Sequence, residues 1–238
     1  MSDGTVVALL GPPGSGKSTV SAALASERAL RVFRLREFAH QQARTNGAIA
    51  DAVARTTDPL GWLPDQVAMA LVRRALDNDF RLTPGRPVIL EGYPGTQAQA
   101  IHLLLHLRTR PGIWFSVIEL VAGIATTAER IGHRQVCPSC DTAHGGPRRP
   151  ARAMPGTPAC CARCGGELTR RLNDAGPVAA HRQARYRLRA PAIRAALQPA
   201  RVPWYAVDAE QSEADVIQAA ASAFDEAVHV TDLKGASL

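Results

Sequence analysis

The stretch LLGPPGSGKSTVSAAL, from Leu9 to Leu24, decides the fold of this 238-residue chain. It matches the pattern G-x-x-x-x-G-K-[ST], in which glycines allow backbone N–H groups to turn inward and cradle a phosphate. The positive end of the helix that follows strengthens such a nest. The sequence therefore predicts a phosphate loop that binds ATP and Mg²⁺ through Gly11, Gly14, Ser15, Gly16, Lys17, Ser18 and Thr19.

The neighbours of the loop favour this interpretation over an ordinary glycine turn. Thr5–Leu10 is a short apolar, β-branched run typical of a buried strand, and Lys17–Ala29 has the Ala- and Leu-rich composition of a helix. In that arrangement we expect Lys17 to reach the β- and γ-phosphates and the hydroxyl of Ser18 to ligate Mg²⁺.

Strand-like apolar runs alternate with helical stretches, which predicts an α/β fold of the P-loop NTPase type. Its centre would be a five-stranded parallel sheet flanked by helices, with strands at Thr5–Leu10, Leu30–Phe33, Pro87–Leu90, Trp114–Leu120 and Val202–Val207. Two insertions interrupt the alternation. The predicted core comprises 1–35, 81–131 and 171–230, a helical insertion covers 36–80, a second insertion covers 132–170, and 231–238 is a tail.

The chain carries a formal net charge of +7, and nearly all of its basic residues are arginines. Such a surface suits nucleic acid and polyphosphate alike, so charge does not separate the two. No apolar run approaches the ~18 residues that a membrane span requires, and no export signal precedes the loop. We therefore expect a cytoplasmic protein without a membrane as partner. Separately, we predict a monomer whose partner is a small-molecule acceptor and not nucleic acid.

Four cysteines form two C-x-x-C pairs, Cys137 with Cys140 and Cys161 with Cys164. Their spacing matches the zinc pattern C-x₂-C-x₁₅₋₂₀-C-x₂-C. Four thiolates close a tetrahedron around zinc and leave no open position, so the predicted Zn²⁺ is structural and staples the second insertion. Cys160 has no partner at this spacing, and the alternative interpretation is five free thiols.

Further blocks follow the phosphate loop in a fixed order: Leu63-Pro64-Asp65, Glu91-Gly92-Tyr93-Pro94-Gly95-Thr96 with Gln99, Arg130 and Arg134, Arg171-Leu172-Asn173-Asp174, and Arg182. Together they resemble the adenylate kinase family of nucleoside monophosphate kinases, in its zinc-containing, long-lid form. The resemblance covers residues 5–228. It implies an acceptor-binding lobe at 36–80 and a zinc-binding lid at 132–170.

The resemblance also implies roles for individual residues. The catalytic residues would be Lys17, Glu91, Arg134, Arg171 and Arg182, and Arg130 would stack on the adenine of ATP. The acceptor would contact Glu37, His40, Leu63, Gly92, Tyr93 and Gln99. Guanidinium groups match phosphate oxygens, so a closing lid that carries them would neutralise the transferring phosphoryl group and exclude water.

The acceptor side departs from the family pattern. The family clamps the phosphate of the acceptor with two arginines, and the matching positions here are His40 and Gly95. Arg34, Arg36 or Arg44 could take their place. Glu91 stands where the family has an aspartate that holds Mg²⁺ through water, and a carboxylate there could also act as the base for a hydroxyl acceptor.

Three functional hypotheses follow. The first is an ATP-dependent phosphotransferase that moves the γ-phosphate of ATP, with Mg²⁺, to a nucleoside monophosphate or similar small acceptor. The second is a kinase for a hydroxyl of a nucleoside or other small metabolite, with Glu91 as base. The third is a zinc-ribbon nucleic-acid-binding ATPase, which ranks last because 132–170 lacks aromatic side chains for stacking on bases.

Overall fold

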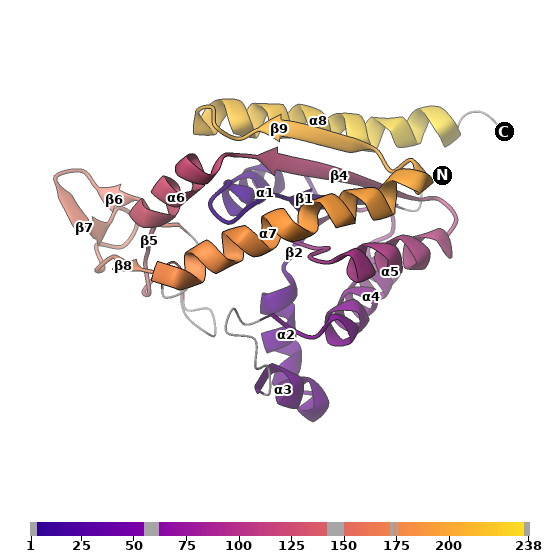
Figure 1. Cartoon of the computed structure of the whole chain (residues 1–238), viewed down its shortest axis with the longest axis horizontal. Helices are drawn as coiled ribbons and strands as arrows, with labels where there is room; N and C mark the ends of the chain where they lie inside the picture. The colour runs from indigo at the N-terminus through magenta and orange to yellow at the C-terminus, as the bar shows by residue number, and fades with distance from the viewer. Residues whose placement is uncertain (1–3, 55–61, 142–149, 172–173, 175, 236–238) are drawn as a thin grey trace.

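A five-stranded parallel sheet forms the centre of the computed structural model, which describes residues 4–54, 62–141, 150–171, 174 and 176–235 (Figure 1). Its strands are β1 (Gly4–Leu10), β2 (Arg31–Phe33), β3 (Val88–Glu91), β4 (Ile113–Val121) and β9 (Trp204–Asp208). They lie in the order β2-β3-β1-β4-β9, and every neighbouring pair is parallel. The predicted fold class and the five predicted strands are confirmed, with boundaries shifted by two residues at most.

Helices cover both faces of the sheet, which is why its strands are apolar without alternation. Successive side chains of a strand point to opposite faces, so Val6 and Ala8 contribute to one core cluster and Val7 and Leu9 to the other. The first face carries α4 (Asp65–Leu82), α5 (Gln97–Arg108) and α7 (Gly176–Leu197). The second face carries α1 (Lys17–Glu27) and α8 (Glu213–Gly235).

The stretch predicted as a helical insertion, 36–80, contains helices that extend away from the sheet. Helix α2 (Leu35–Ala43) and α3 (Gly47–Ala54) project below it in Figure 1. Helix α4 then returns the chain to the sheet, where Ala68, Val72 and Leu76 are buried in the first core cluster. Helix α4 therefore attaches the insertion to the core of the protein.

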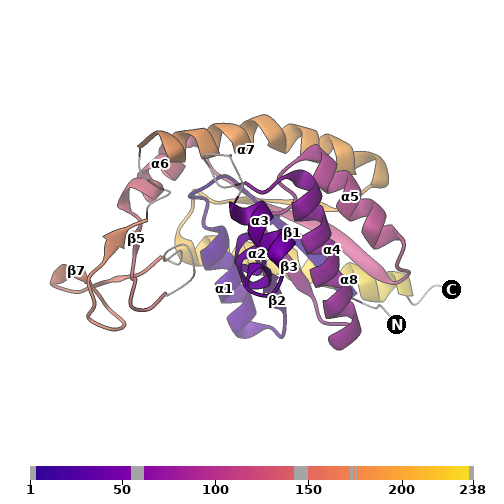
Figure 2. The ribbon, with the colours of Figure 1, turned by 90° about the horizontal axis from the view of Figure 1, so that it is seen from below.

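The second insertion projects from one side of the sheet (Figures 1 and 2). Helix α6 (Ile124–His133) leads into it, four short strands follow, and α7 leads back. The strands are β5 (Gln135–Val136), β6 (Ala153–Met154), β7 (Thr157–Cys161) and β8 (Thr169–Arg170). At its base, buried Gln183 of α7 donates a hydrogen bond to Thr127 of α6 over 2.8 Å, which ties the outgoing helix to the returning one.

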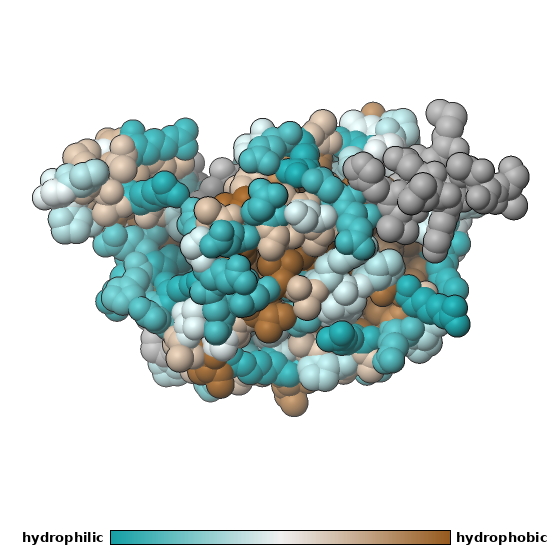
Figure 3. Space-filling model, turned by 90° about the horizontal axis from the view of Figure 1, so that it is seen from above, coloured by the Kyte–Doolittle hydropathy of each residue, from teal (hydrophilic) through white to brown (hydrophobic). Residues whose placement is uncertain are grey.

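The chain ends along the outer side of the molecule. A 3₁₀ turn (Gln198–Ala200) connects α7 to β9, and α8 continues into the stretch 231–238 that is predicted as a tail. The face that carries α8 mixes hydrophilic and hydrophobic residues (Figure 3). Among the described residues, the helices lack the combination of length and apolar composition that crossing a membrane requires. The boundaries of the two insertions stay predictions.

Candidate active site

The phosphate loop lies between β1 and α1 and needs glycine for its shape. At Gly14 φ is +87°, and a Cβ added there would lie 2.6 Å from the backbone oxygen of Thr127. Gly16 has φ +93° and caps the N-terminus of α1. Residues other than glycine rarely adopt these φ angles. Glycine at both positions therefore allows the loop to turn its N–H groups inward.

Lys17 begins α1 at the centre of the loop. Its ammonium donates hydrogen bonds to the backbone oxygens of Gly11 and Pro12, over 2.7 and 2.8 Å. Burial lowers the pKa of Lys17 to about 7, Glu91 opposes this shift, and nearby arginines add to it. These arginines are Arg182, Arg134 and Arg171. A buried ammonium in a cluster of cations is stabilised by an incoming polyanion.

Glu91 ends β3 directly beside the loop, because β3 pairs with β1 and sets Glu91 against Leu9. One of its oxygens accepts a hydrogen bond from the Ser18 hydroxyl over 2.6 Å. The other accepts from Ser21 over 2.6 Å and from the Arg34 guanidinium over 2.8 Å. Hydroxyl and carboxylate oxygens side by side are the donor set that Mg²⁺ prefers, so Ser18 and Glu91 fit the predicted ion.

Asp174 organises two arginines at the base of the second insertion, Arg134 and Arg182. This carboxylate accepts two hydrogen bonds from Arg134, both over 2.6 Å, and lies 3.9 Å from the guanidinium of Arg182. The Asp174 side chain is only 4% exposed, so the Arg134 guanidinium that it binds is fixed in direction. Burial lowers the pKa of Arg182 to about 10, Arg36 and Arg134 add to this shift, and Asp174 opposes it.

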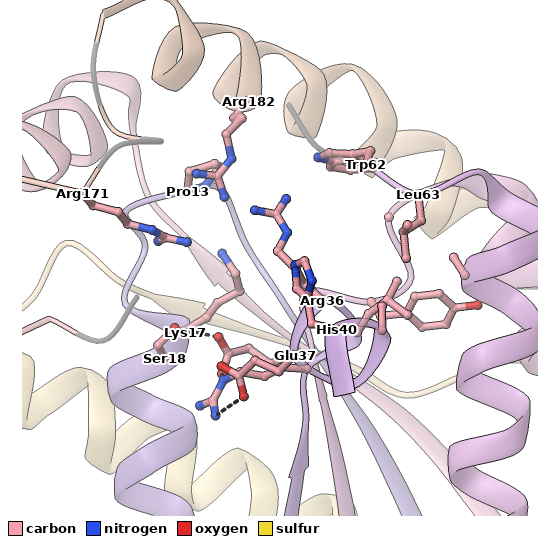
Figure 4. Close-up of a pocket in the computed structure, with 18 of the residues that line it drawn as sticks. Pro13, Lys17, Ser18, Arg36, Glu37, His40, Trp62, Leu63, Arg171 and Arg182 are labelled. Atoms are coloured by element: carbon pink, nitrogen blue, oxygen red, sulfur yellow. Dashed lines mark hydrogen bonds and ion pairs between the residues drawn. The ribbon is translucent and has the colours of Figure 1, made fainter. Parts of the chain in front are cut away.

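A single pocket of about 450 Å³ brings most of the predicted site residues together. Figure 4 shows Lys17, Arg171 and Arg182 on one side of it and His40, Leu63 and Trp62 on the other. The described residues that line the pocket include six basic and two acidic side chains, a balance that suits a polyanion. The predicted site residues that line it are Gly14, Gly16, Lys17, Ser18, Thr19, Glu37, His40, Leu63, Glu91, Gly92, Tyr93, Gln99, Arg134, Arg171 and Arg182.

Three of the residues predicted to bind ATP lie outside this lining. Gly11 and Ser15 are buried in the loop itself and support it from behind. Arg130 donates to the backbone oxygen of Ala209 over 2.6 Å and to that of Gln211 over 3.4 Å, so it is held at the turn that follows β9. Its predicted stacking on adenine stays a prediction.

The side of the pocket that is predicted to bind the acceptor is built by contacts between distant segments. The amide of Gln99 donates to Asp65 over 2.8 Å and accepts from the backbone N–H of Gly95 over 2.8 Å. Gly95 packs against Trp62, because a Cβ added at Gly95 would lie 2.9 Å from the indole. The guanidinium groups of Arg185 and Arg189 in α7 stack on the same indole, with their carbons 5.0 and 4.9 Å from the ring centroid.

Sequence reasoning assigned no role to several of these side chains. Asp174 lies in the block Arg171-Leu172-Asn173-Asp174, but the sequence of this block does not reveal which arginines Asp174 binds. Leu172 and Asn173 fall outside the described residues. Ser21 lies three residues after Ser18, a helical spacing that signals a shared face. Trp62 has no local signal, because its partners come from the loop before α5 and from α7.

The four predicted zinc ligands lie together in the lid. The sulfurs of Cys137, Cys140, Cys161 and Cys164 all fall within 4.8 Å of one another. The Cys140 and Cys161 sulfurs are 3.8 Å apart, close to the edge of a tetrahedron with Zn–S bonds of ~2.3 Å. Backbone N–H groups of Arg163 and Cys164 lower the pKa of Cys161 to about 7, which favours the thiolate that zinc binds. The cluster can hold a metal ion, and zinc fits it.

A phosphate loop, a carboxylate at the neighbouring strand end and arginines directed at both define the class of P-loop phosphotransferases. No protein-family model matches the chain. Individual curated proteins do: the chain is similar over about three quarters of its length to proteins named adenylate kinase.

Three of these relatives represent distant organisms. The adenylate kinase of Thermoanaerobacter sp. (strain X514) is 29% identical over 168 residues, which cover 71% of this chain and 74% of the relative. That of Thermococcus kodakarensis is 28% identical over 187 residues, 76% of each chain. That of Novosphingobium aromaticivorans is 29% identical over 183 residues, 76% of this chain and 81% of the relative.

Proposed function

We propose that this chain transfers the γ-phosphate of ATP to the phosphate of a nucleoside monophosphate, with Mg²⁺. The observation that carries the proposal is the continuity of one basic pocket from the phosphate loop to the acceptor side. A reaction between two phosphate-bearing substrates needs both ends of such a pocket to attract anions. The relatives are named adenylate kinases, which agrees with this substrate class.

The chain's own residues supply positioning and charge. The loop N–H groups and Lys17 bind the phosphates of ATP, while Arg171 and Arg182 approach from the lid side of the pocket (Figure 4). Asp174 aims Arg134 at the same region. Bound beside Ser18 and Glu91, Mg²⁺ would neutralise charge on the transferring phosphoryl group. Closure of the lid would exclude water and so suppress hydrolysis of ATP.

The surroundings of Glu91 favour a phosphate acceptor over a hydroxyl acceptor. A hydroxyl needs a base, whereas a phosphate is already ionised. Three donors, from Ser18, Ser21 and Arg34, already contact the Glu91 carboxylate. A carboxylate accepts at about four lone-pair sites, so these donors leave about one for a substrate hydroxyl. Holding a metal-bound water beside Ser18 leaves the contacts with Ser21 and Arg34 in place.

For the lid we propose a structural zinc ion held by the four cysteines. The lid contains a very small buried cluster, made of Cys137, Cys161 and Leu168 with Ala151 packed against it. Burial of so little apolar surface stabilises a fold only weakly, and a closed four-thiolate site supplies the missing free energy. Four protein ligands leave no position for substrate.

An ADP-release assay with ATP and Mg²⁺ tests the proposed function. AMP, CMP, UMP, GMP and dAMP are run beside the corresponding nucleosides, and Lys17→Met serves as the control that removes loop chemistry. We expect turnover with at least one monophosphate, none with its nucleoside, and none in the Lys17→Met variant. Turnover of nucleosides but not monophosphates would replace the proposal with the hydroxyl-acceptor alternative.

A further inference from the structure

We propose that Arg36 grips the phosphate of the acceptor, in place of both arginines that are missing at positions 40 and 95. This inference rests on the proposed nucleoside monophosphate kinase activity. It assigns a specificity-determining residue, because a cation at this position selects acceptors that carry a phosphate. It also explains how an acceptor site can work with His40 and Gly95 where the family pattern has arginines.

Arg36 occupies a suitable place on α2. It lies four residues before His40, so the two side chains share one face of the helix, one turn apart. Both line the pocket. Figure 4 shows the guanidinium of Arg36 directed into the pocket toward Arg182, with Lys17 on the same side as Arg182. An anion between Arg36 and Arg182 would therefore lie next to the phosphate loop, where the acceptor must meet the γ-phosphate.

The electrostatics of the pair point the same way. After burial, the positive charge of Arg36 is the largest cause that lowers the pKa of half-buried Arg182, so the two guanidinium groups repel each other. Two guanidinium groups that face each other across a cavity are stabilised when a phosphate dianion bridges them. Asp174 offsets part of the charge from the lid side, and it lies against Arg134 and Arg182.

The other arginines that could replace the clamp are placed differently. Arg34 donates to Glu91 over 2.8 Å and to Ser21 over 3.0 Å, so it supports the carboxylate beside the loop. Arg44 is exposed at the C-terminal end of α2 and is not part of the pocket lining. Arg36 combines a cationic head with a position in the pocket near Arg182.

The packing of Trp62 accounts for the loss of the second clamp. A Cβ at Gly95 would lie 2.9 and 3.1 Å from two carbons of the indole, so an arginine there would collide with it. Arg185 and Arg189 hold the indole in place from α7. The space used by the second arginine in the family pattern is thus taken by Trp62, and the clamp must come from another element.

Steady-state kinetics of Arg36→Ala and Arg36→Gln test the assignment, with Arg44→Ala as the matched control on the same helix. A lost charge-assisted contact to phosphate should raise the KM for the monophosphate by about 10- to 100-fold. In the same variants we expect the KM for ATP to change by less than about threefold, which is less than the change that the loss of one such contact would cause. Arg44→Ala should behave as the wild type, and circular dichroism confirms that the variants are folded.

A rescue separates a specific clamp from a general loss of charge. His40→Arg restores a guanidinium on the same helix face, so Arg36→Ala combined with His40→Arg should recover most of the affinity for the monophosphate. Gly95→Arg alone should not improve binding, because Trp62 fills the space, whereas Gly95→Arg with Trp62→Leu should rescue Arg36→Ala.

The outcomes distinguish the two proposals. If the wild type turns over no monophosphate, the proposed function is wrong and this inference falls with it. If the wild type turns over a monophosphate and Arg36→Ala keeps its acceptor KM, the proposed function stands and Arg36 is not the clamp. A loss of affinity that His40→Arg leaves unchanged would also overturn the inference, because a guanidinium restored on the same helix face would then not restore binding.

Discussion

We call the part of the pocket around the phosphate loop, proposed to bind ATP, the donor half, and the part around Trp62, Gly95 and Gln99, proposed to bind the acceptor, the acceptor half. The two halves are built in different ways. The donor half depends on short-range features: positive φ angles in the loop, a lysine at the start of α1 and arginines held by Asp174. The acceptor half depends on side chains from remote segments, such as Trp62, which packs between Gly95 of one loop and two arginines of α7. Backbone geometry fixes the first half, and interlocking side chains fix the second.

This difference teaches where such an enzyme can change its substrate. A phosphate nest tolerates few substitutions, because a Cβ at Gly14 would strike the backbone oxygen of Thr127 at 2.6 Å. The acceptor half can exchange one set of packed side chains for another while the sheet stays intact. We therefore expect donor-half substitutions to lower kcat for every acceptor, and acceptor-half substitutions to change the KM of the acceptor.

Arg171→Ala should have the largest effect of the changes considered. Its guanidinium lies on the same side of the pocket as Lys17 and Arg182, so we expect its loss to remove charge stabilisation from the transition state (Figure 4). Removing one such donor typically lowers kcat by about 10²–10³-fold. Arg170→Ala is the matched control, because Arg170 is the exposed neighbour on β8. Stopped assays with several acceptors measure both variants, and near-normal turnover in Arg171→Ala would remove Arg171 from the donor half.

Loss of the metal should come next. Cys137→Ser should abolish zinc binding, measured by metal analysis, which should give about one equivalent in the wild type. Arg134 and Arg171 flank the lid, and a displacement of about 1 Å can cost 10²-fold in rate, so kcat should fall by up to this factor. Cys160→Ser is the control, since Cys160 lies outside the cluster. The sheet should stay folded by circular dichroism, and global unfolding would contradict a merely local role.

The pH dependence of ATP binding should be smaller again. The pKa of Lys17 is lowered to about 7 in the unliganded pocket, and bound phosphates favour the protonated form. Binding therefore takes up a proton, and affinity is greatest below pH 7 and declines above it, by at most about tenfold per pH unit. Calorimetry in buffers of different ionisation enthalpy measures the proton uptake. Lys17→Arg should show no such slope between pH 7.5 and about 9.5, because its guanidinium keeps its charge.

The fold could be predicted from the sequence because its signals are local. The phosphate loop, five apolar runs and the alternation of strands with helices are each contained in short stretches, and all five strands form within two residues of their predicted bounds. The cysteine cluster was also predicted from spacing, and the structure places the four sulfurs together. Such features can be recognised in the sequence without knowledge of tertiary contacts.

The acceptor half could be predicted only in part. Gly95 was recognised as a departure, but its partner Trp62 is 33 positions earlier and the stacked Arg185 lies on α7, so no local pattern joins them. Glu91 was expected beside the loop, whereas its contacts with Ser21 and Arg34 depend on how α1 and the start of α2 meet β3. These contacts require packing that composition and spacing do not encode.

Asp65→Asn should produce the smallest effect, and it sharpens the boundary between the halves. Asp65 accepts from the Thr96 hydroxyl over 2.9 Å and from the Gln99 amide over 2.8 Å, which fixes the direction of that amide in the pocket. An asparagine offers one acceptor and one NH₂ group, so one of these two donors would lose its partner. A net hydrogen bond of this kind corresponds to about a three- to tenfold rise in the acceptor KM.

The test of Asp65→Asn compares kinetic parameters rather than activity alone. We expect kcat and the KM for ATP to stay unchanged, because the hydrogen bonds of Asp65 with Thr96 and Gln99 both lie in the acceptor half. Asp51→Asn on α3 is a control of the same chemistry at a position outside the pocket lining. A fall in kcat in Asp65→Asn with an unchanged acceptor KM would show that the network around Gln99 positions the transferring group, and the two halves would then be one mechanical unit.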